Sequence, residues 1–447
     1  MTGDIRARRL SAATLEQRFA AVHPPLREAE VKIEAERCYY CYDAPCTAAC
    51  PTGIDIPGFI RAIAGGRPDV AAARILRANP VGAVCARVCP VETLCEADCV
   101  RHTEEDRPVQ IGQLQRHAMD AEFARRRIAN DAPPPDGHRI AVVGAGPAGL
   151  SCAHTLAHLG HRVTVYEARD IPGGLSAHGI AAYKVLGDVV QREVDYLTGN
   201  GNVELRTGVM LGRHITLNQL RREHDAVFIG IGLQNVAELG IEGEALTGVE
   251  DAVRYIERLR KGPLEELEVG RRVVVIGGGM TAIDIAVQSR LLGAEEVHLC
   301  YRRGPETMGA SPLEQQLARD HGVFIHHWLR PLRIDADNGA AAAVSFARTA
   351  AGPNGLTDTG ETLTLPADQV FKAIGQRLDT APLGDGAPLD AKARLTVDAR
   401  LQTPLPGVWA GGDCVGTGDD LTVVAAEDGK RAARAIHAWL AAREDEA

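Results

Sequence analysis

Eight cysteines in the first hundred residues have the spacing of metal ligands. The first four follow C-x2-C-x4-C-x3-C-P and the second four follow C-x3-C-P-x4-C-x3-C. A cysteine followed by proline at the end of such a run is typical of two-cluster ferredoxins, where that cysteine ligates the other cluster. The spacing therefore predicts two [4Fe–4S] clusters. The candidate ligands are Cys38, Cys41, Cys46, Cys50, Cys85, Cys89, Cys95 and Cys99.

Disulfides and zinc are the alternatives for thiols at this density. No apolar stretch precedes Glu16, so there is no sign of a secretion signal, and no segment approaches the roughly 20 apolar residues of a membrane span. We therefore expect a reducing, cytoplasmic setting without a membrane, which disfavours disulfides. Zinc sites usually pair two C-x2-C knuckles, and only Cys38 and Cys41 have that spacing. A zinc-stapled, non-enzymatic scaffold stays open as an alternative.

Length and charge limit the classes of protein. A chain of 447 residues is too long for one core and predicts about three domains. The net charge of −10, from 49 basic and 59 acidic residues, argues against a nucleic-acid-binding surface. Apolar residues make up 45% of the chain, which is typical of a globular protein.

A glycine-rich loop with the spacing G-x-G-x-x-G begins at Gly144. It follows an apolar run expected to form a strand over 139–143 and precedes a helix expected over 150–159. A second strand ends in Glu167, 18 residues after Gly149, where an acid can accept ribose hydroxyls. In this context the backbone can approach a pyrophosphate at the helix N-terminus. The loop predicted to bind a dinucleotide consists of Gly144, Ala145, Gly146, Pro147, Ala148 and Gly149.

A second copy follows 133 residues later, counted from Gly144 to Gly277. Tyr301 stands where the first copy has its acid, and Arg302 and Arg303 follow it. Arginines here accommodate the 2′-phosphate of NADPH, whereas the acid of the first copy suits FAD. The alternative is that both arginines are only exposed surface residues. The elements expected in this copy are a strand over 271–276, the loop 277–282, a helix to 292 and a strand over 297–301.

Further apolar runs end in glycines and complete the dinucleotide pattern. Residues 226–232 and 370–375 are expected to be strands that return to a sheet and end near a ligand. A last strand leads into a Gly-Gly-Asp turn at 411–413, and a helix is expected from 421 to about 440. The N-terminus of that helix can face the polar part of a flavin.

Composition changes define the domain boundaries. Before the proline-rich stretch 131–137 we expect helices, over 14–36, 68–78 and 111–128 and one capped by Asp55. After it the pattern alternates strand and helix. The predicted fold is α/β with an N-terminal all-α iron–sulfur domain and two Rossmann-like domains, for FAD and NAD(P), the second inserted in the first. The expected ranges are 1–132 for the cluster domain, 133–265 and 367–447 for the FAD domain, and 266–366 for the NAD(P) domain.

Four glycine motifs together resemble a known flavoprotein module. They are Gly144–Gly149, Gly173–Leu175, Gly277–Gly279 and Ala410–Asp413. Their combination resembles the two-dinucleotide module shared by glutamate synthase small subunits and dihydropyrimidine dehydrogenases. Five residues separate Cys89 from Cys95, as in dihydropyrimidine dehydrogenases, whereas glutamate synthase small subunits usually have a shorter spacing there. The local sequences around Cys46, Asp55 and Cys85 also resemble those of the bacterial NAD-dependent dihydropyrimidine dehydrogenase small subunits.

The resemblance implies a ligand set for each cluster. One cluster is expected to use Cys38, Cys41 and Cys46 together with Gln115. The other is expected to use the remaining cysteines except Cys85, which are Cys50, Cys89, Cys95 and Cys99. Spacing alone would instead assign Cys85 to the first cluster, so the choice between Cys85 and Gln115 stays open.

The resemblance also implies two sets of dinucleotide-binding residues. Beyond the first loop, the flavin site would include Glu167, Gly174, Leu175, Lys184, Leu211, Gly412, Asp413, Leu421 and Thr422. The nicotinamide site would consist of Gly278, Gly279, Met280, Thr281, Arg302, Arg303, Ala373, Ile374 and Gly375. Gly309 stands where the NADPH-using animal enzymes have a further arginine, and bacterial small subunits are NADH-linked despite a similar Tyr-Arg-Arg. The coenzyme is therefore left open between NADH and NADPH.

The implied function is electron input to a partner. Hydride transfer from a nicotinamide to a flavin needs stacking and exclusion of water, so we expect no catalytic acid or base. The resemblance implies that electrons pass through the clusters to a separate FMN-containing large subunit that reduces uracil or thymine, in an α2β2 assembly, since this chain has no (β/α)8 pattern. The runner-up is a glutamate synthase small subunit. A thioredoxin-reductase-like enzyme is disfavoured because Cys152, Cys300 and Cys414 are scattered single thiols.

Overall fold

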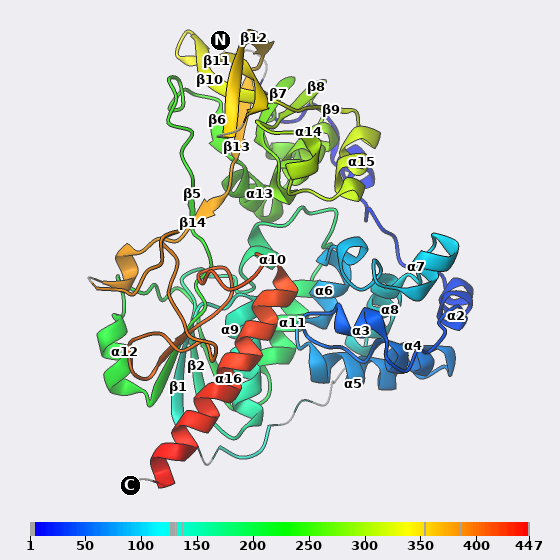
Figure 1. Cartoon of the computed structure of the whole chain (residues 1–447), viewed down its shortest axis with the longest axis vertical. Helices are drawn as coiled ribbons and strands as arrows, with labels where there is room; N and C mark the ends of the chain where they lie inside the picture. The colour runs from blue at the N-terminus through cyan, green and yellow to red at the C-terminus, as the bar shows by residue number, and fades with distance from the viewer. Residues whose placement is uncertain are drawn as a thin grey trace. The chain divides into compact units, whose positions relative to one another are not determined.

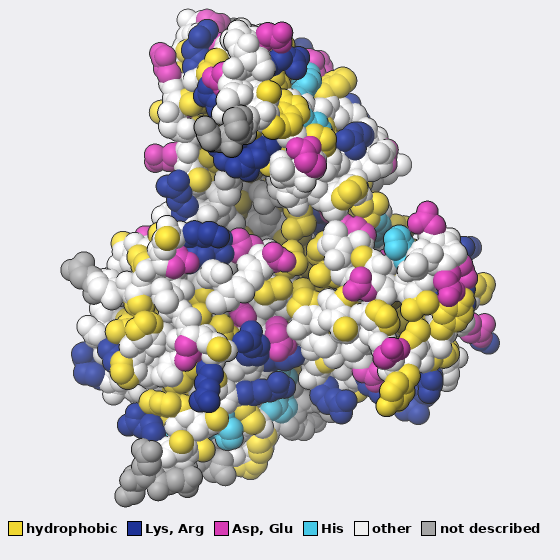
Figure 2. Space-filling view, viewed as in Figure 1, with side chains coloured by type: hydrophobic (Ala, Val, Ile, Leu, Met, Phe, Trp, Pro, Cys, Tyr) yellow, Lys and Arg dark blue, Asp and Glu magenta, His cyan; other side chains and the backbone are white. Residues whose placement is uncertain are grey.

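The computed structural model describes residues 5–125, 130, 132–135, 137–352, 355–384 and 386–445 (Figure 1). It divides into two compact units. Unit 1 comprises Met1–Val22, His178–Leu186 and Asn235–Arg377, and unit 2 comprises His23–Ala177, Gly187–Gln234 and Leu378–Ala447. Acidic and basic side chains are interspersed on the face of the molecule drawn in Figure 2.

The N-terminal part of unit 2 is helical, and its described residues 23–125 contain no strand, as predicted. Asp55 caps one helix as expected, because its Oδ1 accepts a hydrogen bond from the Gly58 amide at 3.0 Å. Phe59, Ile60 and Leu114 are almost fully buried in its core, and each such side chain stabilises the fold by about 1.5–3 kcal/mol. The elements are α2 (Glu28–Glu36), α3 (Pro45–Ala48), α4 (Ile56–Ala64), α5 (Pro68–Ala78), α6 (Gly82–Val88), η1 (Val91–Thr93), α7 (Val100–Glu105) and α8 (Ile111–Phe123).

The single helix expected over 14–36 is wrong. The chain forms α1 (Ala12–Arg18) and then α2, and the segment between them contains Pro24 and Pro25. Proline has no amide to donate within a helix and keeps the preceding residue out of the α region. The two helices also lie in different units, α1 in unit 1 and α2 in unit 2. The helix expected over 111–128 begins at the expected residue and ends earlier, and Ile128 lies outside the described residues.

The second part of unit 2 is a five-stranded parallel sheet in the order β15-β4-β1-β2-β3. β1, β4 and β15 are buried along almost their whole length, which is typical of parallel strands covered on both faces. α9 and α16 pack closely, and the Ser151 hydroxyl donates to the Ala426 carbonyl at 2.7 Å. The strands are β1 (Arg139–Val143), β2 (Arg162–Tyr166), β3 (Val203–Arg206), β4 (Ala226–Ile229) and β15 (Val408–Ala410). The helices are α9 (Pro147–His158), α11 (Val189–Thr198), α12 (Leu217–Glu223), η4 (Ala381–Leu383) and α16 (Thr422–Asp445), with α10 (Leu175–His178) at the junction with unit 1.

Unit 1 contains a second parallel sheet, in the order β6-β13-β7-β8-β9. An antiparallel sheet in the order β10-β11-β12 and the short pair β14 and β5 complete its strands in the described residues. The strands are β5 (Asn235–Val236), β6 (Val249–Asp251), β7 (Arg272–Gly277), β8 (Glu296–Cys300), β9 (Val323–His326), β10 (Leu329–Asp337), β11 (Ala340–Gly352), β12 (Gly355–Pro366), β13 (Gln369–Ala373) and β14 (Gln376–Arg377). The helices besides α1 are α13 (Ala252–Lys261), η2 (Leu264–Glu266), α14 (Met280–Leu292), η3 (Pro305–Thr307) and α15 (Pro312–Asp320).

The two Rossmann-like folds are confirmed, and the second interrupts the first, but the expected ranges need correction. β6 and α13 precede residue 266 and belong to unit 1, because β6 pairs with β13. β13 follows residue 366 and also belongs to unit 1, because it pairs with β7. Residues 1–22 lie in unit 1 rather than with the cysteine-rich helices. Within the described part of the chain, no helix has the length and apolarity needed to cross a membrane.

Candidate functional site

The glycines of the first loop are needed for two different reasons. A Cβ on Gly144, whose φ is +98°, would lie 2.4 Å from the Gly230 carbonyl oxygen, and one on Gly149 would lie 1.9 Å from the Gly144 oxygen. Gly146 is different, because among the described atoms its Cβ would meet only the Gly174 Cα, at 3.7 Å. Protein packing thus explains two of the glycines. Gly146 leaves a bare surface of the kind that a pyrophosphate needs.

The same loop begins α9. Gly146 is the N-cap and Pro147 follows it, and no side-chain cap bond is formed there by a described residue. The amides of the first helical turn are therefore available to an anion. The turn that holds Gly174 lies against this loop, because the Gly173 amide donates to the Ala145 carbonyl at 2.8 Å. Leu175 begins α10 directly after that turn.

Glu167 follows β2, as predicted. Its Oε2 accepts a hydrogen bond from the Ala145 amide at 2.7 Å, and its Oε1 accepts one from the Arg169 amide at 2.9 Å. Each carboxylate oxygen can accept a second hydrogen bond. The carboxylate therefore fixes the glycine loop and keeps acceptor capacity for ribose hydroxyls, and that second role stays a prediction.

The Gly-Gly-Asp turn at 411–413 follows β15 and lies at the same end of the sheet as the first glycine loop. Gly412 has a φ of +75°, its amide donates to Asp428 Oδ2 at 3.0 Å, and its Cβ would lie 3.0 Å from the Ala148 Cβ. The turn is thus in contact with the N-terminal turn of α9. Burial raises the pKa of Asp413 to about 6, the nearby Asp420 adds to this, and Arg394 opposes it. Leu421 and Thr422 lie at the start of α16, and Leu211 is buried in the core of this part of unit 2.

Lys184 belongs to unit 1, whereas these residues belong to unit 2. Its Nζ lies 2.7 Å from Asp284 Oδ1 and 2.8 Å from Glu314 Oε1, and the Tyr183 hydroxyl donates to Asp284 at 3.3 Å. Burial disfavours the ammonium, but the two carboxylates outweigh it and hold the pKa of Lys184 above its usual value. The described contacts of Lys184 thus belong to a buried ion pair network. Its expected role at the flavin stays a prediction.

Replacing Lys184 with methionine is expected to destabilise the fold by about 3–5 kcal/mol, because Asp284 and Glu314 lose a cation in a buried setting. The free energy of unfolding in urea measures this. Lys261→Met is the matched control, because Lys261 pairs with Glu257 on an exposed face of α13 and its loss should cost less than about 1 kcal/mol. Equal stability of the two variants would contradict the prediction.

The glycines of the second loop fall into the same two classes as those of the first loop. A Cβ on Gly277 would lie 2.2 Å from the Ala373 carbonyl oxygen, and one on Gly278 would lie 2.4 Å from the ring of Tyr301. A Cβ on Gly279 would have none of the described atoms within 4 Å. Gly279 is also the N-cap of α14, again without a side-chain cap from the described residues. It therefore corresponds to Gly146, and Met280 and Thr281 form the first turn of the helix.

The other predicted nicotinamide residues meet at this edge of the sheet. Gly277 and Ala373 are partners on β7 and β13, so Ile374 and Gly375 follow beside the loop. Arg302 and Arg303 are exposed after β8, and the Thr349 hydroxyl donates to the Arg302 carbonyl at 2.8 Å. 

Position 309 lies directly over the second loop. A Cβ on Gly309 would lie 3.8 Å from both the Gly278 oxygen and the Gly279 Cα, and the Ala310 amide donates to Gly278 at 2.9 Å. A side chain at position 309 would therefore contact the loop, and glycine leaves that space free.

The cysteines form two groups within the helical part of unit 2. Burial raises the pKa of the Cys46 thiol to about 12, and the neighbouring thiols of Cys99, Cys38 and Cys41 add to this. Burial also raises the pKa of Cys38, against a hydrogen bond from the Tyr40 amide, with Cys41 and Cys99 adding again. Cys99 is therefore a neighbour of the first three cysteines.

The second group is centred on Cys89. A hydrogen bond with Cys85 and burial raise the pKa of Cys89, and Cys95 and Cys50 add to the shift. Burial raises the pKa of Cys95, and Glu96, Cys50 and then Cys46 add to it. Cys50 is thus a neighbour of cysteines from the second run, as the ferredoxin-like spacing predicts.

This grouping differs from the partition implied by the resemblance, because Cys99 lies with the first three cysteines rather than with Cys50. The first group then has four thiols without Cys85 or Gln115, and the question of the fourth ligand moves to the second group. Gln115 is buried on α8, and its Nε2 donates to the Gly82 carbonyl at the start of α6 at 2.8 Å. Sequence spacing identifies the thiols but does not show which of them are neighbours.

The donor set fits iron–sulfur clusters. Each of the eleven cysteines is a free thiol, and Cys152, Cys300 and Cys414 are buried away from the runs. In the part of the chain that the structure describes, no three His, Cys, Asp or Glu side chains are placed to hold a single metal ion. A [4Fe–4S] cluster has a different requirement, because its four ligands bind four separate iron atoms.

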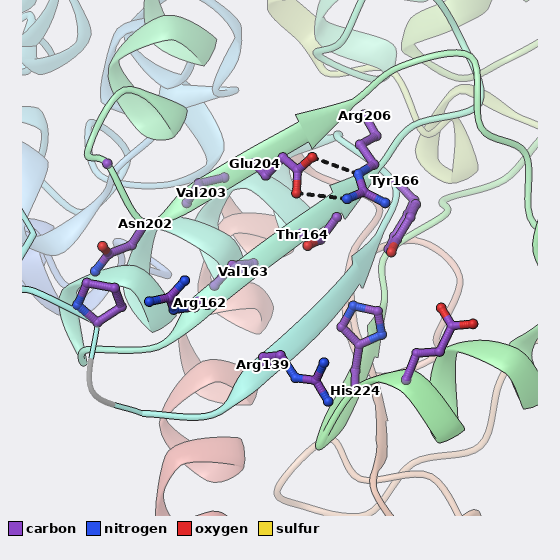
Figure 3. Close-up of a pocket in the computed structure, with 13 residues that line it drawn as sticks. Arg139, Arg162, Val163, Thr164, Tyr166, Asn202, Val203, Glu204, Arg206 and His224 are labelled. Atoms are coloured by element: carbon purple, nitrogen blue, oxygen red, sulfur yellow. Dashed lines mark hydrogen bonds and ion pairs between the residues drawn. The ribbon is translucent and has the colours of Figure 1, made fainter.

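A pocket of about 540 Å³ in unit 2 lies along β1, β2 and β3 (Figure 3). Arg139 and Arg162, which line it, begin β1 and β2, whereas the dinucleotide loop follows the end of β1. Tyr166 and an ion pair between Glu204 and Arg206 line it further along the strands. None of the residues predicted for the flavin site is among those that line the pocket, and sequence reasoning did not identify it.

Two family models together match most of the chain. The model described as pyridine nucleotide-disulphide oxidoreductase matches residues 138–429. The model described as dihydropyrimidine dehydrogenase domain II, 4Fe-4S cluster, matches residues 15–127. The matched ranges correspond to the region of the two dinucleotide folds and to the helical cysteine region.

Relatives and solved structures agree with this division. The glutamate synthase [NADPH] small chain of Escherichia coli K12 is 33% identical, over 94% of each chain. The NAD-dependent dihydropyrimidine dehydrogenase subunit PreT of Salmonella typhimurium is 35% identical, over 91% of this chain and 94% of its own. The structure of Mycobacterium tuberculosis FprA in complex with NADPH is similar in fold, with a TM-score of 0.60 and 19% identity over 70% of this chain and 86% of its own. Lactococcus lactis thioredoxin reductase has a TM-score of 0.55 and 21% identity, over 68% of this chain and 100% of its own.

The bare glycines, the uncapped helix starts and the two thiol groups fit the cofactors that these families share, which are FAD, NAD(P)H and [4Fe–4S] clusters. Both glycine loops and the helices that follow them lie within residues 138–429, and the eight cysteines of the two runs lie within residues 15–127. The chain therefore belongs to the pyridine nucleotide-disulphide oxidoreductase family, as an NAD(P)H-dependent iron–sulfur flavoprotein oxidoreductase.

Proposed function

We propose that this chain is the electron-input subunit of a dihydropyrimidine dehydrogenase. It oxidises NAD(P)H and passes the electrons through two clusters to an FMN-containing large subunit that reduces uracil or thymine, in an α2β2 assembly. The observation that carries this choice is the five-residue spacing between Cys89 and Cys95, which resembles the dihydropyrimidine dehydrogenases. The similarity to PreT over almost the whole chain supports it.

A glutamate synthase small subunit is the second candidate. The Escherichia coli small chain matches 94% of this chain at 33% identity, which is close to the similarity of PreT. Arg302 and Arg303 also suit the 2′-phosphate of NADPH. In that case the partner would be a large amidotransferase subunit. The two candidates share the electron-input chemistry and differ in the partner.

The residues of the chain bind and orient the reactants. When bound, FAD accepts a hydride from NAD(P)H and the clusters carry the electrons singly. The loop around Gly146 would hold the pyrophosphate of the flavin nucleotide, and Glu167 would orient its ribose. The loop around Gly279 would do the same for the nicotinamide nucleotide, and Arg302 and Arg303 would accommodate a 2′-phosphate on its ribose. No side chain needs to act as an acid or a base in this transfer.

The cluster ligands follow from the thiol groups and from the resemblance. The first cluster is assigned to Cys38, Cys41, Cys46 and Cys99. The second is assigned to Cys50, Cys89 and Cys95, with Gln115 from the resemblance as the fourth ligand. Cys85 then takes part only through its hydrogen bond with Cys89. Since Cys50 and Cys99 each lie with cysteines of the other run, the clusters tie the two halves of the helical region together.

Coexpression with a candidate FMN subunit tests the proposal. The purified complex is expected to oxidise NADH or NADPH only when uracil or thymine is present, and parallel assays with the two coenzymes identify the preferred one. Native mass measurement should show two copies of each chain. The control is coexpression with a glutamate synthase large subunit. Oxidation that depends on that subunit and not on the FMN subunit would contradict the proposal and favour the second candidate.

A further inference from the structure

The connection between α5 and α6 is held by two charged side chains from the flavin-binding part of unit 2. Lys430, on α16, donates to the Ala78 carbonyl at the end of α5 and to the Thr52 carbonyl at 3.4 Å. Glu193, on α11, accepts hydrogen bonds through Oε1 from the amides of Ala83 at 2.7 Å and Val84 at 3.2 Å. Both side chains are buried. The flavin-binding part is thus fastened to the cysteine-rich helices by side-chain to backbone bonds.

Glu193 satisfies amides that α6 cannot satisfy itself. The N-cap of α6 is Val81, whose side chain cannot accept a hydrogen bond. In the described structure, the first amides of α6 therefore receive no cap from Val81. The first amides of a helix need an acceptor, and a buried amide without one costs about 1–3 kcal/mol. The acceptor is supplied from α11, which packs beside α6 (Figure 1).

The helix that Glu193 fixes leads to a cluster ligand. α6 is followed directly by Cys89, its C-cap, whose amide donates to the Cys85 carbonyl at 3.0 Å. A movement of the start of so short a helix is transmitted to its end, because the helix backbone is rigid over two turns. The position of the Cys89 thiol therefore depends on the hydrogen bonds at Ala83 and Val84.

Gln115 is fixed by the same turn. Its Nε2 donates to the Gly82 carbonyl at 2.8 Å, and a carbonyl can only accept, so the amide nitrogen points to Gly82 and Oε1 points away. A side chain at position 82 would have no room, because a Cβ there would lie 2.6 Å from the Ile75 Cγ2. The orientation of the Gln115 amide is thus set by the first residue of α6.

We propose that Glu193 is a positioning residue for the second cluster, which acts from the flavin-binding part by fixing the start of α6 and, through it, Cys89 and Gln115. This rests on the ligand assignment given above under the proposed function. Because Glu193 belongs to α11 and its targets belong to the cluster helices, the geometry of one cluster is made dependent on docking of the flavin-binding part.

Glutamine is a close substitute for Glu193. Burial raises the pKa of Glu193 to about 8, against the hydrogen bonds from Val84 and Ala83 and the nearby Arg87. At pH 7 the carboxyl is therefore mostly protonated, and a neutral amide oxygen can accept the same two hydrogen bonds. Glu193→Gln keeps the acceptor and loses only the ionisable group, whereas Glu193→Ala removes the acceptor, so the pair of variants separates the acceptor from the charge.

The test compares iron content, flavin content and the EPR spectrum of the dithionite-reduced full-length protein. Glu193→Ala is expected to keep FAD and the EPR signal of the first cluster, lose the signal of the second, and fall to about half of the iron. Glu193→Gln is expected to match the wild type. Lys430→Met is the control, because it loosens the same connection at Ala78 without touching α6, and it should keep both signals.

Four outcomes overturn the proposal or its basis. Glu193→Ala with both signals unchanged overturns the positioning role, as does Lys430→Met losing the same signal, since general docking would then be the cause. Should Glu193→Ala not give a folded flavoprotein, Glu193→Asp decides: an altered second signal supports the role and two unchanged signals overturn it. Cys89→Ser must lose the second signal. If it does not, the ligand assignment fails, independently of Glu193.

Discussion

Replacing Cys99 with serine is expected to remove the same EPR signal as replacing Cys38 or Cys46, and to lower the iron content from about eight to about four atoms per chain. The reason is the position of the Cys99 thiol, which lies close enough to Cys38 and Cys46 to raise the pKa of both. Electron transfer to an acceptor beyond the clusters should fall to background, because one of the carriers is missing. Chemical iron analysis and EPR of the reduced protein measure both effects.

Two further variants sharpen this result. Cys50→Ser should remove the other signal, because Cys50 is a neighbour of Cys89 and Cys95. Cys85→Ser should keep both signals and nearly all of the iron, because Gln115 is assigned as the fourth ligand and a serine hydroxyl can replace the hydrogen bond between Cys85 and Cys89. Loss of the same signal in Cys99→Ser and Cys50→Ser would contradict the grouping and restore the partition implied by the resemblance. Loss of the second signal in Cys85→Ser would make Cys85, not Gln115, its fourth ligand.

The second large effect is expected at the two bare glycines. Gly146→Val should fold but fail to retain FAD, and Gly279→Val should retain FAD but lose on the order of a hundredfold in kcat/KM for NAD(P)H, or about 2.7 kcal/mol. Both residues have negative φ, −85° and −95°, and their side chains would have room in the described structure. The substitutions therefore act on the ligand rather than on the fold. Flavin content and steady-state kinetics with each coenzyme measure the outcome.

The first glycine of each loop supplies the contrast. Gly144→Val and Gly277→Val should lower the stability of the fold itself, because a side chain at either position meets a carbonyl oxygen within 2.4 Å. Thermal unfolding of the four variants separates the two classes. A Gly279→Val protein that binds NAD(P)H as well as the wild type would show that the nucleotide does not lie against this loop.

Local patterns predicted the elements that depend on local chemistry. The cap at Asp55, the helix over 68–78 and both strand–loop–helix units are found as expected, because caps, glycine turns and apolar runs act over a few residues. The prolines at 24 and 25 also indicate a break, but the helical spacing of the apolar residues continues on both sides of them and predicts one helix where the chain forms two.

Long-range partners could not be predicted in the same way. Nothing local shows that Cys99 returns to Cys46, that Lys184 meets Asp284 and Glu314, or that Glu193 accepts hydrogen bonds from α6. These contacts join residues separated by about 50 to 130 positions, so they depend on the packing of whole elements. The spacing of the cysteines identifies the ligands, whereas the packing of the helices determines which ligands are neighbours.

The assignment of the first 22 residues to unit 1 has a consequence for folding during synthesis. The Arg8 amide donates to the Glu265 carbonyl, and Arg6 pairs with Val269, so these two contacts cannot form until residue 269 has left the ribosome. At 5–20 residues per second that takes roughly 15 to 50 s. The cysteine helices emerge long before then. The contacts of Arg6 and Arg8 with residues 265–269 thus form late, after the cysteine helices have already been made.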